Sequence, residues 1–258
     1  MSPPITVGVL ALQGGFQEHL DLVRKAAAWL ATAQSPAPSP KPDIAAIEVR
    51  TEGELRRCDA LIIPGGESTA ISLVATQSGL MEPLREFVKV NQRPVWGTCA
   101  GAILLADEAN ATKKGGQELI GGLGVRVHRN HFGRQIESFV ADLDLPFLSG
   151  GDGNTKTAPS PFPGVFIRAP IVEEILSTAP TDAKSSSSVE VLAVLPGRKT
   201  KVDGVSQSTA DDSVGDIVAV RQGNIFATSF HPELTDDIRI HVWWLEQVLQ
   251  SNASASSA

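Results

Sequence analysis

Cysteine and long apolar runs are both scarce in this chain of 258 residues. The two cysteines, Cys58 and Cys99, lie in different contexts and cannot form a disulfide framework, so we expect free thiols in a reducing compartment. No run of about 18 apolar residues occurs, and no membrane-spanning helix is therefore predicted. Met1 to Pro4 lead directly into a strand-like run, without the pattern of a signal peptide. We expect a cytoplasmic protein that does not associate with a membrane.

Positive charge is also in deficit. The chain has 22 Lys and Arg against 29 Asp and Glu, which gives a formal net charge of −7. Nucleic-acid-binding surfaces are basic, so no nucleic-acid partner is expected. The five histidines and two cysteines show no zinc-like spacing, and we predict neither a metal site nor a cofactor.

Short apolar runs alternate with helix-forming segments along most of the chain. Residues 5–12 and 60–63 have the pattern of buried parallel strands, and residues 16–33 have helical spacing of apolar positions. This alternation predicts an α/β fold, a single-domain three-layer sandwich with a mainly parallel central sheet, over residues 1–250. A final helix is expected over residues 236–250.

Segments rich in Pro, Ser and Gly interrupt this pattern. They predict surface insertions near residues 34–42, 149–163 and 181–214, and residues 251–258 are expected to form a disordered tail. Shorter strand-like pieces at residues 119–127, 135–141 and 164–167 predict an antiparallel or edge extension of the sheet.

The segment Gly97-Thr98-Cys99-Ala100-Gly101 joins an apolar run to a helix expected to continue to about Asn110. This is the layout of a nucleophile elbow, with cysteine in place of serine. The two glycines fit a strained turn that packs strand against helix too closely for side chains. A helix N-terminus beneath the sulfur also favours the thiolate. Cys99 is therefore a candidate nucleophile, and the alternative is a buried structural cysteine.

His231 lies two residues before Glu233, in a polar loop after the strand-like residues 224–228. If it reaches Cys99, His231 can act as general base while Glu233 holds the imidazole tautomer. The alternative is a surface histidine before a proline.

Gly65 and Gly66 directly follow the strand-like residues 60–63 and precede a helix. Their backbone N–H groups, with the N–H of Ala100, form a candidate oxyanion hole. The alternative is an ordinary strand-to-helix turn with Ser68 or Thr69 as helix cap.

The elbow at residues 97–101 and the segment His231-Pro232-Glu233 resemble the triad of the class I glutamine amidotransferases. Four further segments narrow the similarity: Val9-Leu10-Ala11-Leu12-Gln13-Gly14, Ile63-Pro64-Gly65-Gly66-Glu67-Ser68-Thr69, Arg129-Asn130-His131-Phe132-Gly133-Arg134-Gln135 and Val165-Phe166-Ile167-Arg168-Ala169-Pro170. Together they resemble the glutaminase subunits of pyridoxal 5′-phosphate synthase, from about Ile5 to about Val248.

This resemblance implies a flavodoxin-like glutamine amidotransferase fold and the hydrolysis of L-glutamine to L-glutamate and ammonia through a thioester on Cys99. The ammonia would pass to a synthase subunit that makes pyridoxal 5′-phosphate (vitamin B6). The resemblance places Gln13 and the helix start at residues 17–19 against that partner. It places the substrate glutamine against a set of residues on three segments, namely Gly66, Glu67, Ser68, Arg129, Ile167 and Arg168.

Other interpretations remain open from the sequence. Arg129 and Arg168 can instead be exposed residues at the rim of the pocket, and His19 can be a solvated helix residue. Another triad cysteine hydrolase, such as a γ-glutamyl hydrolase, would use the same three residues. A regulatory subunit that has kept the fold without catalysis is a further alternative.

Overall fold

The computed structural model describes residues 4–32, 43–110, 117–129, 138–148, 160–176, 187–196 and 215–255. The predicted insertion near residues 34–42 lies outside the described residues. So do residues 149–159 of the second predicted insertion and residues 181–186 and 197–214 of the third.

A ten-stranded sheet forms the centre of the molecule, in the order β2-β1-β3-β4-β12-β11-β9-β6-β5, with β10 paired to β11. Its first five strands in this order are parallel, whereas β11 and β9 run antiparallel to their neighbours. The strand bounds are β1 (Ile5–Leu10), β2 (Ile44–Val49), β3 (Ala60–Ile63), β4 (Val95–Thr98), β5 (Ala106–Ala109), β6 (Leu123–His128), β9 (Ile171–Ile175), β10 (Glu190–Leu195), β11 (Asp216–Gln222) and β12 (Ile225–Thr228). The predicted α/β fold with a mainly parallel sheet is confirmed.

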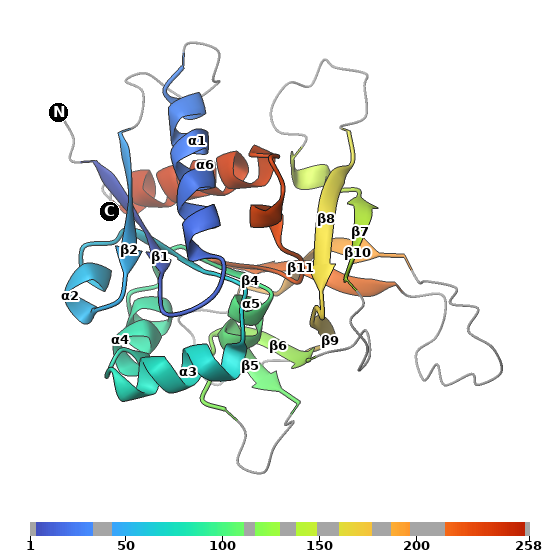
Figure 1. The fold of residues 1–258 in the computed structure, drawn as a ribbon, viewed down its shortest axis with the longest axis horizontal. Helices are drawn as coiled ribbons and strands as arrows, with labels where there is room; N and C mark the ends of the chain where they lie inside the picture. Colours follow the sequence, from blue (N-terminus) through green and yellow to red (C-terminus); the bar gives the residue numbers. More distant parts are fainter. Residues whose placement is uncertain are drawn as a thin grey trace.

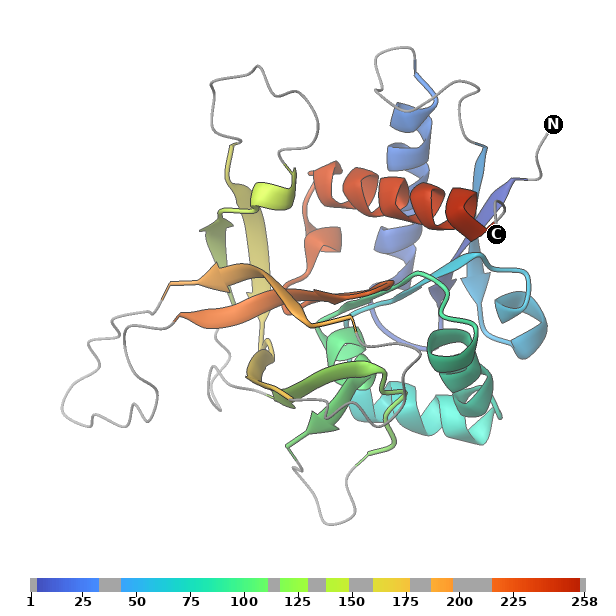
Figure 2. The same ribbon diagram turned by 180° about the vertical axis from the view of Figure 1, so that it is seen from behind.

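Helices cover both faces of this sheet. On one face lie α1 (Phe16–Leu30) and α6 (Arg239–Ala255), and on the other lie α3 (Ser68–Gln77), α4 (Met81–Arg85) and α5 (Ala100–Leu105) (Figures 1 and 2). Shorter helical segments are α2 (Glu52–Leu55), the π-helical η1 (Glu86–Val90) and the 3-10 turns η2 (Pro146–Leu148) and η3 (Pro232–Leu234). The three predicted layers are therefore present.

The central strands are buried on both sides, which explains why their sequences are almost continuously apolar. In β3, Ile62 packs into the hydrophobic cluster that contains Trp244 of α6. Its neighbour Ile63 packs into the opposite cluster, with Ile71 of α3. Successive side chains thus join the two helical layers to the sheet.

The carboxyl ends of β1, β3, β4 and β12 meet at one edge of the sheet because these strands are parallel. The backbone N–H of Cys99 donates to the carbonyl of Thr228 at 2.8 Å and so continues the β4–β12 ladder by one residue. The predicted elbow thereby emerges at the end of a central strand, beside the loop that carries His231.

Two predicted helices have different ends in the structure. The elbow helix stops at Leu105 instead of about Asn110, because Ala106 turns extended and residues 106–109 pair with β6 as strand β5. The final helix begins at Arg239, where the carboxylate of Asp237 accepts from the Arg239 N–H at 3.0 Å. It then continues to Ala255, into the segment expected to be a tail.

The predicted edge extension is only partly correct. Strand β6 does join the main sheet, antiparallel to β9. However, among the described strands β7 (Ser138–Leu143) and β8 (Phe162–Ile167) pair with each other alone, in a separate antiparallel sheet. Pairing partners are set by tertiary packing, which alternation within a short segment does not encode.

Candidate active site

Cys99 occupies a strained backbone position at the junction of β4 and α5. Its φ of 45° and ψ of −100° lie in a region that non-glycine residues rarely adopt, and its side chain is almost fully buried. A Cβ on Gly101 would lie 2.0 Å from the carbonyl oxygen of Ile63, and one on Gly97 would lie 2.5 Å from the carbonyl carbon of Gly101. The close packing expected at the two elbow glycines is therefore present.

His231 and Glu233 form a buried pair directly beside the elbow. His231 Nδ1 lies 2.7 Å from Glu233 Oε1, and the side chain of Glu233 is only 1% exposed. The backbone N–H of His231 donates to the carbonyl of Val165 at 2.8 Å, which ties this loop to β8. A Cβ on Gly65 would lie 2.3 Å from His231 Cε1 and 3.4 Å from Cys99 Cβ, so Gly65 lies against both side chains.

The electrostatics of this pair favour an imidazolium between two acidic groups. Burial alone would lower the pKa of His231, but its interaction with Cys99, its hydrogen bond to Glu233 and the negative charge of both groups raise that pKa to about 10. Burial would raise the pKa of Glu233, yet its interactions with His19 and His231 hold that pKa well below its usual range. The sequence-predicted residues Cys99, His231 and Glu233 are thus brought together in the order expected of a triad.

The Gly65–Gly66 turn, which is part of the candidate oxyanion hole, packs against the turn that follows β1. Gly15 N–H donates to the carbonyl of Gly65 at 3.1 Å, and a Cβ on Gly14 would lie 1.8 Å from that oxygen. The exposed side chain of Gln13 accepts from the Glu67 N–H at 2.7 Å. Gln13 therefore reaches the turn that contains the glycines, while remaining accessible to a partner.

Glu67, Ser68 and Arg129 gather at the N-terminus of α3. The carboxylate of Glu67 accepts from the N–H groups of Thr69 (3.1 Å) and Ala70 (2.6 Å), so the helix cap is Glu67 and not Ser68 or Thr69, which the alternative interpretation of this turn had named. Arg129 Nη2 donates to Thr69 Oγ1 at 3.2 Å and lies 4.0 Å from Glu67 Oε1. Because the Arg129 side chain is only 10% exposed, it is not a rim residue.

Ile167 and Arg168 follow the end of β8, and both are exposed. Arg168 has a φ of 44°, so its backbone is left-handed without being glycine. Such positions often accompany functional sites, because the surrounding structure must hold them. The bond from His231 to Val165 places β8 next to the loop of the predicted triad.

Two contributors to this region were missed or misplaced by sequence reasoning. Ser68 Oγ and Thr69 Oγ1 both donate to Gln117 Oε1, at 3.1 and 3.2 Å, and no sequence pattern singled out Gln117. The placement of His19 on the partner-facing surface is wrong: it is fully buried, with Nε2 3.3 Å from Glu233 Oε2. A signal was available, because His19 shares the helical spacing of Val23, Ala26 and Leu30 on the buried face of α1.

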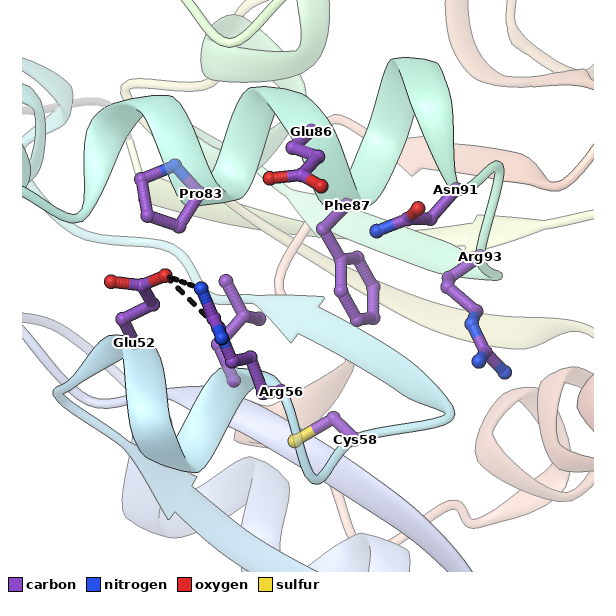
Figure 3. Close-up of a pocket in the computed structure, with 9 residues that line it drawn as sticks. Glu52, Arg56, Cys58, Pro83, Glu86, Phe87, Asn91 and Arg93 are labelled. Carbon is purple, nitrogen blue, oxygen red and sulfur yellow. Dashed lines mark hydrogen bonds and ion pairs between the residues drawn. The ribbon is translucent and has the colours of Figure 1, made fainter.

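The second cysteine lies in a different environment. Cys58 lines a surface pocket of about 270 Å³ between α2 and the α4–η1 helix, opposite Phe87 (Figure 3). Its thiol donates to the carbonyl of Glu54 at 3.3 Å, and burial raises its pKa to about 12. Cys58 is thus protonated and acts as a structural residue.

Within the described parts of the chain, no group of three or more His, Cys, Asp or Glu side chains is arranged to hold a metal ion. None of the described helices combines the length and the apolar character that a membrane crossing requires.

Known proteins resemble this chain over nearly its whole length. The SNO glutamine amidotransferase family matches residues 9–250. The chain is 42% identical to the probable pyridoxal 5′-phosphate synthase subunit PDX2 of Arabidopsis thaliana, over 98% of this chain and 90% of that protein. It is 44% identical to the pyridoxal 5′-phosphate synthase subunit PdxT of Streptomyces avermitilis, over 96% of each. A crystal structure described as a glutamine amidotransferase superimposes with a TM-score of 0.67 and 37% identity, over 94% of this chain and 98% of the other.

Proposed function

Because the chain belongs to the SNO glutamine amidotransferase family, we propose that it hydrolyses L-glutamine with Cys99, His231 and Glu233 as its catalytic triad. The observation that carries this assignment is the strained Cys99 beside the buried His231–Glu233 hydrogen bond of 2.7 Å. A strained nucleophile, a base and a group that orients the base are the three parts that acyl transfer needs.

In the first half of the reaction, the Cys99 thiolate attacks the carbonyl carbon of the side-chain amide. The carbonyl π electrons move onto oxygen, and the N–H groups of Ala100 and of the Gly65–Gly66 turn stabilise that oxyanion. As the oxyanion collapses, the C–N bond breaks and its electron pair takes a proton from His231 Nε2. Ammonia leaves, and a thioester remains on Cys99.

Water completes the reaction. Neutral His231 takes a proton from the attacking water, whose oxygen bonds to the thioester carbon. Collapse of the second oxyanion breaks the C–S bond and returns Cys99 as thiolate beside the His231 imidazolium. Glu233 accepts the hydrogen bond from His231 Nδ1 in both halves, and thereby keeps Nε2 pointed at the reacting atoms.

The substrate pocket in this proposal lies at the N-terminus of α3 and the end of β8. Arg129, nearly buried beside Glu67, supplies a positive charge for the α-carboxylate of glutamine. Gly66, Glu67 and Ser68 line one side, and Ile167 with Arg168 line the other.

We infer that the ammonia passes to a pyridoxal 5′-phosphate synthase subunit, since relatives similar over nearly the whole chain carry that name. The exposed Gln13 is the candidate partner contact, because it also touches the Glu67 N–H. A reducing cytoplasm is the compartment in which a free nucleophilic thiol persists.

The decisive experiment compares Cys99→Ala with Cys58→Ala, a matched substitution at the other buried cysteine. Glutaminase turnover is measured as ammonia release, with a cognate synthase subunit present. Loss of the nucleophile should lower kcat by several orders of magnitude, because oxyanion stabilisation and binding leave only a residual rate. Cys58→Ala should retain the parent rate.

A glutamine-analogue alkylator provides the structural control. Mass spectrometry should find one adduct, on Cys99, in the parent and in Cys58→Ala, and none in Cys99→Ala. Turnover of a folded Cys99→Ala within about tenfold of the parent would remove Cys99 from the mechanism.

A further inference from the structure

The carboxylate of Glu233 has a second partner outside the triad. His231 occupies Oε1 at 2.7 Å, while His19 Nε2 lies 3.3 Å from Oε2. The side chains of His19 and Glu233 are 0% and 1% exposed, so no bulk water competes for this oxygen. A buried carboxylate needs donors at both oxygens, because an unpaired charge in the interior is costly.

His19 is itself fixed from three sides. Its Nδ1 lies 3.1 Å from Nε2 of His241 on α6, and its Nε2 also lies 3.2 Å from Thr98 Oγ1. Its ring meets Trp96 edge-on, with centroids 5.6 Å apart. Since Thr98 and Trp96 belong to β4, directly before Cys99, His19 connects the strand of the nucleophile with the carboxylate.

The hydrogen-bond partners restrict which nitrogen of His19 carries a proton. An unprotonated Nε2 would turn its lone pair toward the carboxylate oxygen 3.3 Å away, so a proton on Nε2 is the form that fits Glu233 Oε2, and Thr98 Oγ1 can accept as well as donate. Burial lowers the pKa of His241 well below its usual range, so His241 is neutral. A single hydrogen bond joins its Nε2 to His19 Nδ1. Cys99, a further ionisable group of the site, faces His231 from the elbow.

We propose that His19 is a positioning residue of the triad: its Nε2, 3.3 Å from Glu233 Oε2, pairs with the carboxylate and holds it so that Oε1 receives the Nδ1–H of His231. Gly15, at the start of the same helix, supports this arrangement, because a Cβ there would lie 3.0 Å from Glu233 Oε1. The α1 helix therefore approaches the carboxylate at two points. The inference rests on the proposed glutaminase function and extends it by one residue.

The test uses His19→Leu, which removes the donor but keeps a buried apolar side chain. With the synthase subunit present, kcat should fall about 10- to 100-fold, because a hydrogen bond to a charged group is lost, while KM stays within about twofold. The alkaline limb of kcat/KM, which reports the proton on His231, should move about one unit to lower pH. His19→Gln can return an N–H donor near the Nε2 position and should recover most of the rate.

Val23→Ala is the matched control on the same buried face of α1, one turn later. It should lower thermal stability but leave the pH profile of the folded enzyme unchanged. A purely structural role for His19 predicts the same result for His19→Leu, and that outcome would overturn the proposal.

A measurement on the unaltered protein guards against a variant that does not fold. Nitrogen NMR of histidine-labelled protein should show His19 protonated at Nε2 through the neutral range. A His19 unprotonated at Nε2 would refute the donor assignment. If the parent chain itself shows no turnover, the glutaminase function fails, whereas a normal profile for His19→Leu in an active background refutes only the role of His19.

Discussion

Replacing Glu233 by glutamine tests whether the carboxylate orients His231 or takes part in proton transfer. The native carboxylate accepts from His231 Nδ1 at 2.7 Å, and His19 Nε2 lies 3.3 Å from its other oxygen. A glutamine amide has one accepting oxygen and one donating nitrogen. One of the two interactions must therefore be lost, or a histidine must change its tautomer.

The size of the effect follows from what is removed. A hydrogen bond to a charged group contributes about 1.5–3 kcal/mol, so Glu233→Gln should lower kcat/KM by roughly 10- to 100-fold. His231→Asn removes the proton donor for the leaving ammonia and should lower it by about 10³-fold or more. A smaller loss of kcat/KM in Glu233→Gln than in His231→Asn indicates that the carboxylate orients His231 and does not itself transfer a proton.

The pH profile of kcat/KM in Glu233→Gln provides an independent test. The pKa of His231 is about 10, and the hydrogen bond and negative charge of Glu233 contribute to raising it. Without that charge the pKa of His231 should fall, so the alkaline limb of kcat/KM should move to lower pH in Glu233→Gln.

Ammonia release in the presence of the synthase subunit, followed from neutral to alkaline pH, measures both quantities. Glu246→Gln, at a half-buried glutamate of α6 outside the triad, is the matched control and should keep the parent profile. Equal and small losses in Glu233→Gln and His231→Asn would refute the orienting role and require a different base. An unshifted alkaline limb in Glu233→Gln would refute the electrostatic argument.

Three further results are expected. Gly101→Ala should reduce soluble folded protein, because its Cβ would lie 2.0 Å from the Ile63 carbonyl oxygen; normal thermal stability would contradict the close packing. Folding raises the pKa of His231 from 6.5 to about 10, so the folded state binds more protons in that interval. This contribution to the free energy of unfolding is complete below pH 6.5 and is lost as the pH rises to about 10. Urea titrations should therefore show that the free energy of unfolding declines less over this pH range in His231→Asn than in the parent. If docking of the synthase subunit raises turnover through Gln13, Gln13→Ala, which removes the acceptor of the Glu67 N–H, should reduce that stimulation without preventing alkylation of Cys99. Unchanged stimulation would exclude Gln13 as the contact that couples docking to activity.

Local sequence signals were sufficient for the elbow. Glycines two residues before and after Cys99 have a steric cause, and the structure shows the contacts that side chains there would violate. The apolar strands were equally readable, since burial on both faces leaves a continuous apolar run. Such features depend on residues close together in the chain.

Features that depend on distant contacts were not readable. Ala106 extends a helical pattern, yet it begins a strand because β6 offers a pairing partner 17 positions later (Ala106 with Leu123). Glu67 replaces Ser68 or Thr69 as helix cap because the turn at Gln13 fixes its backbone. In each case tertiary structure overrides a local preference.

The burial of His19 connects these observations to the candidate partner contact at Gln13. Its helix starts at the Gly15 N-cap, and Gly15 donates to the Gly65 carbonyl while it packs against Glu233. A partner that displaces the exposed Gln13 would therefore press on the turn that contacts both the oxyanion glycines and the triad carboxylate. Such a displacement would act on two parts of the site at once.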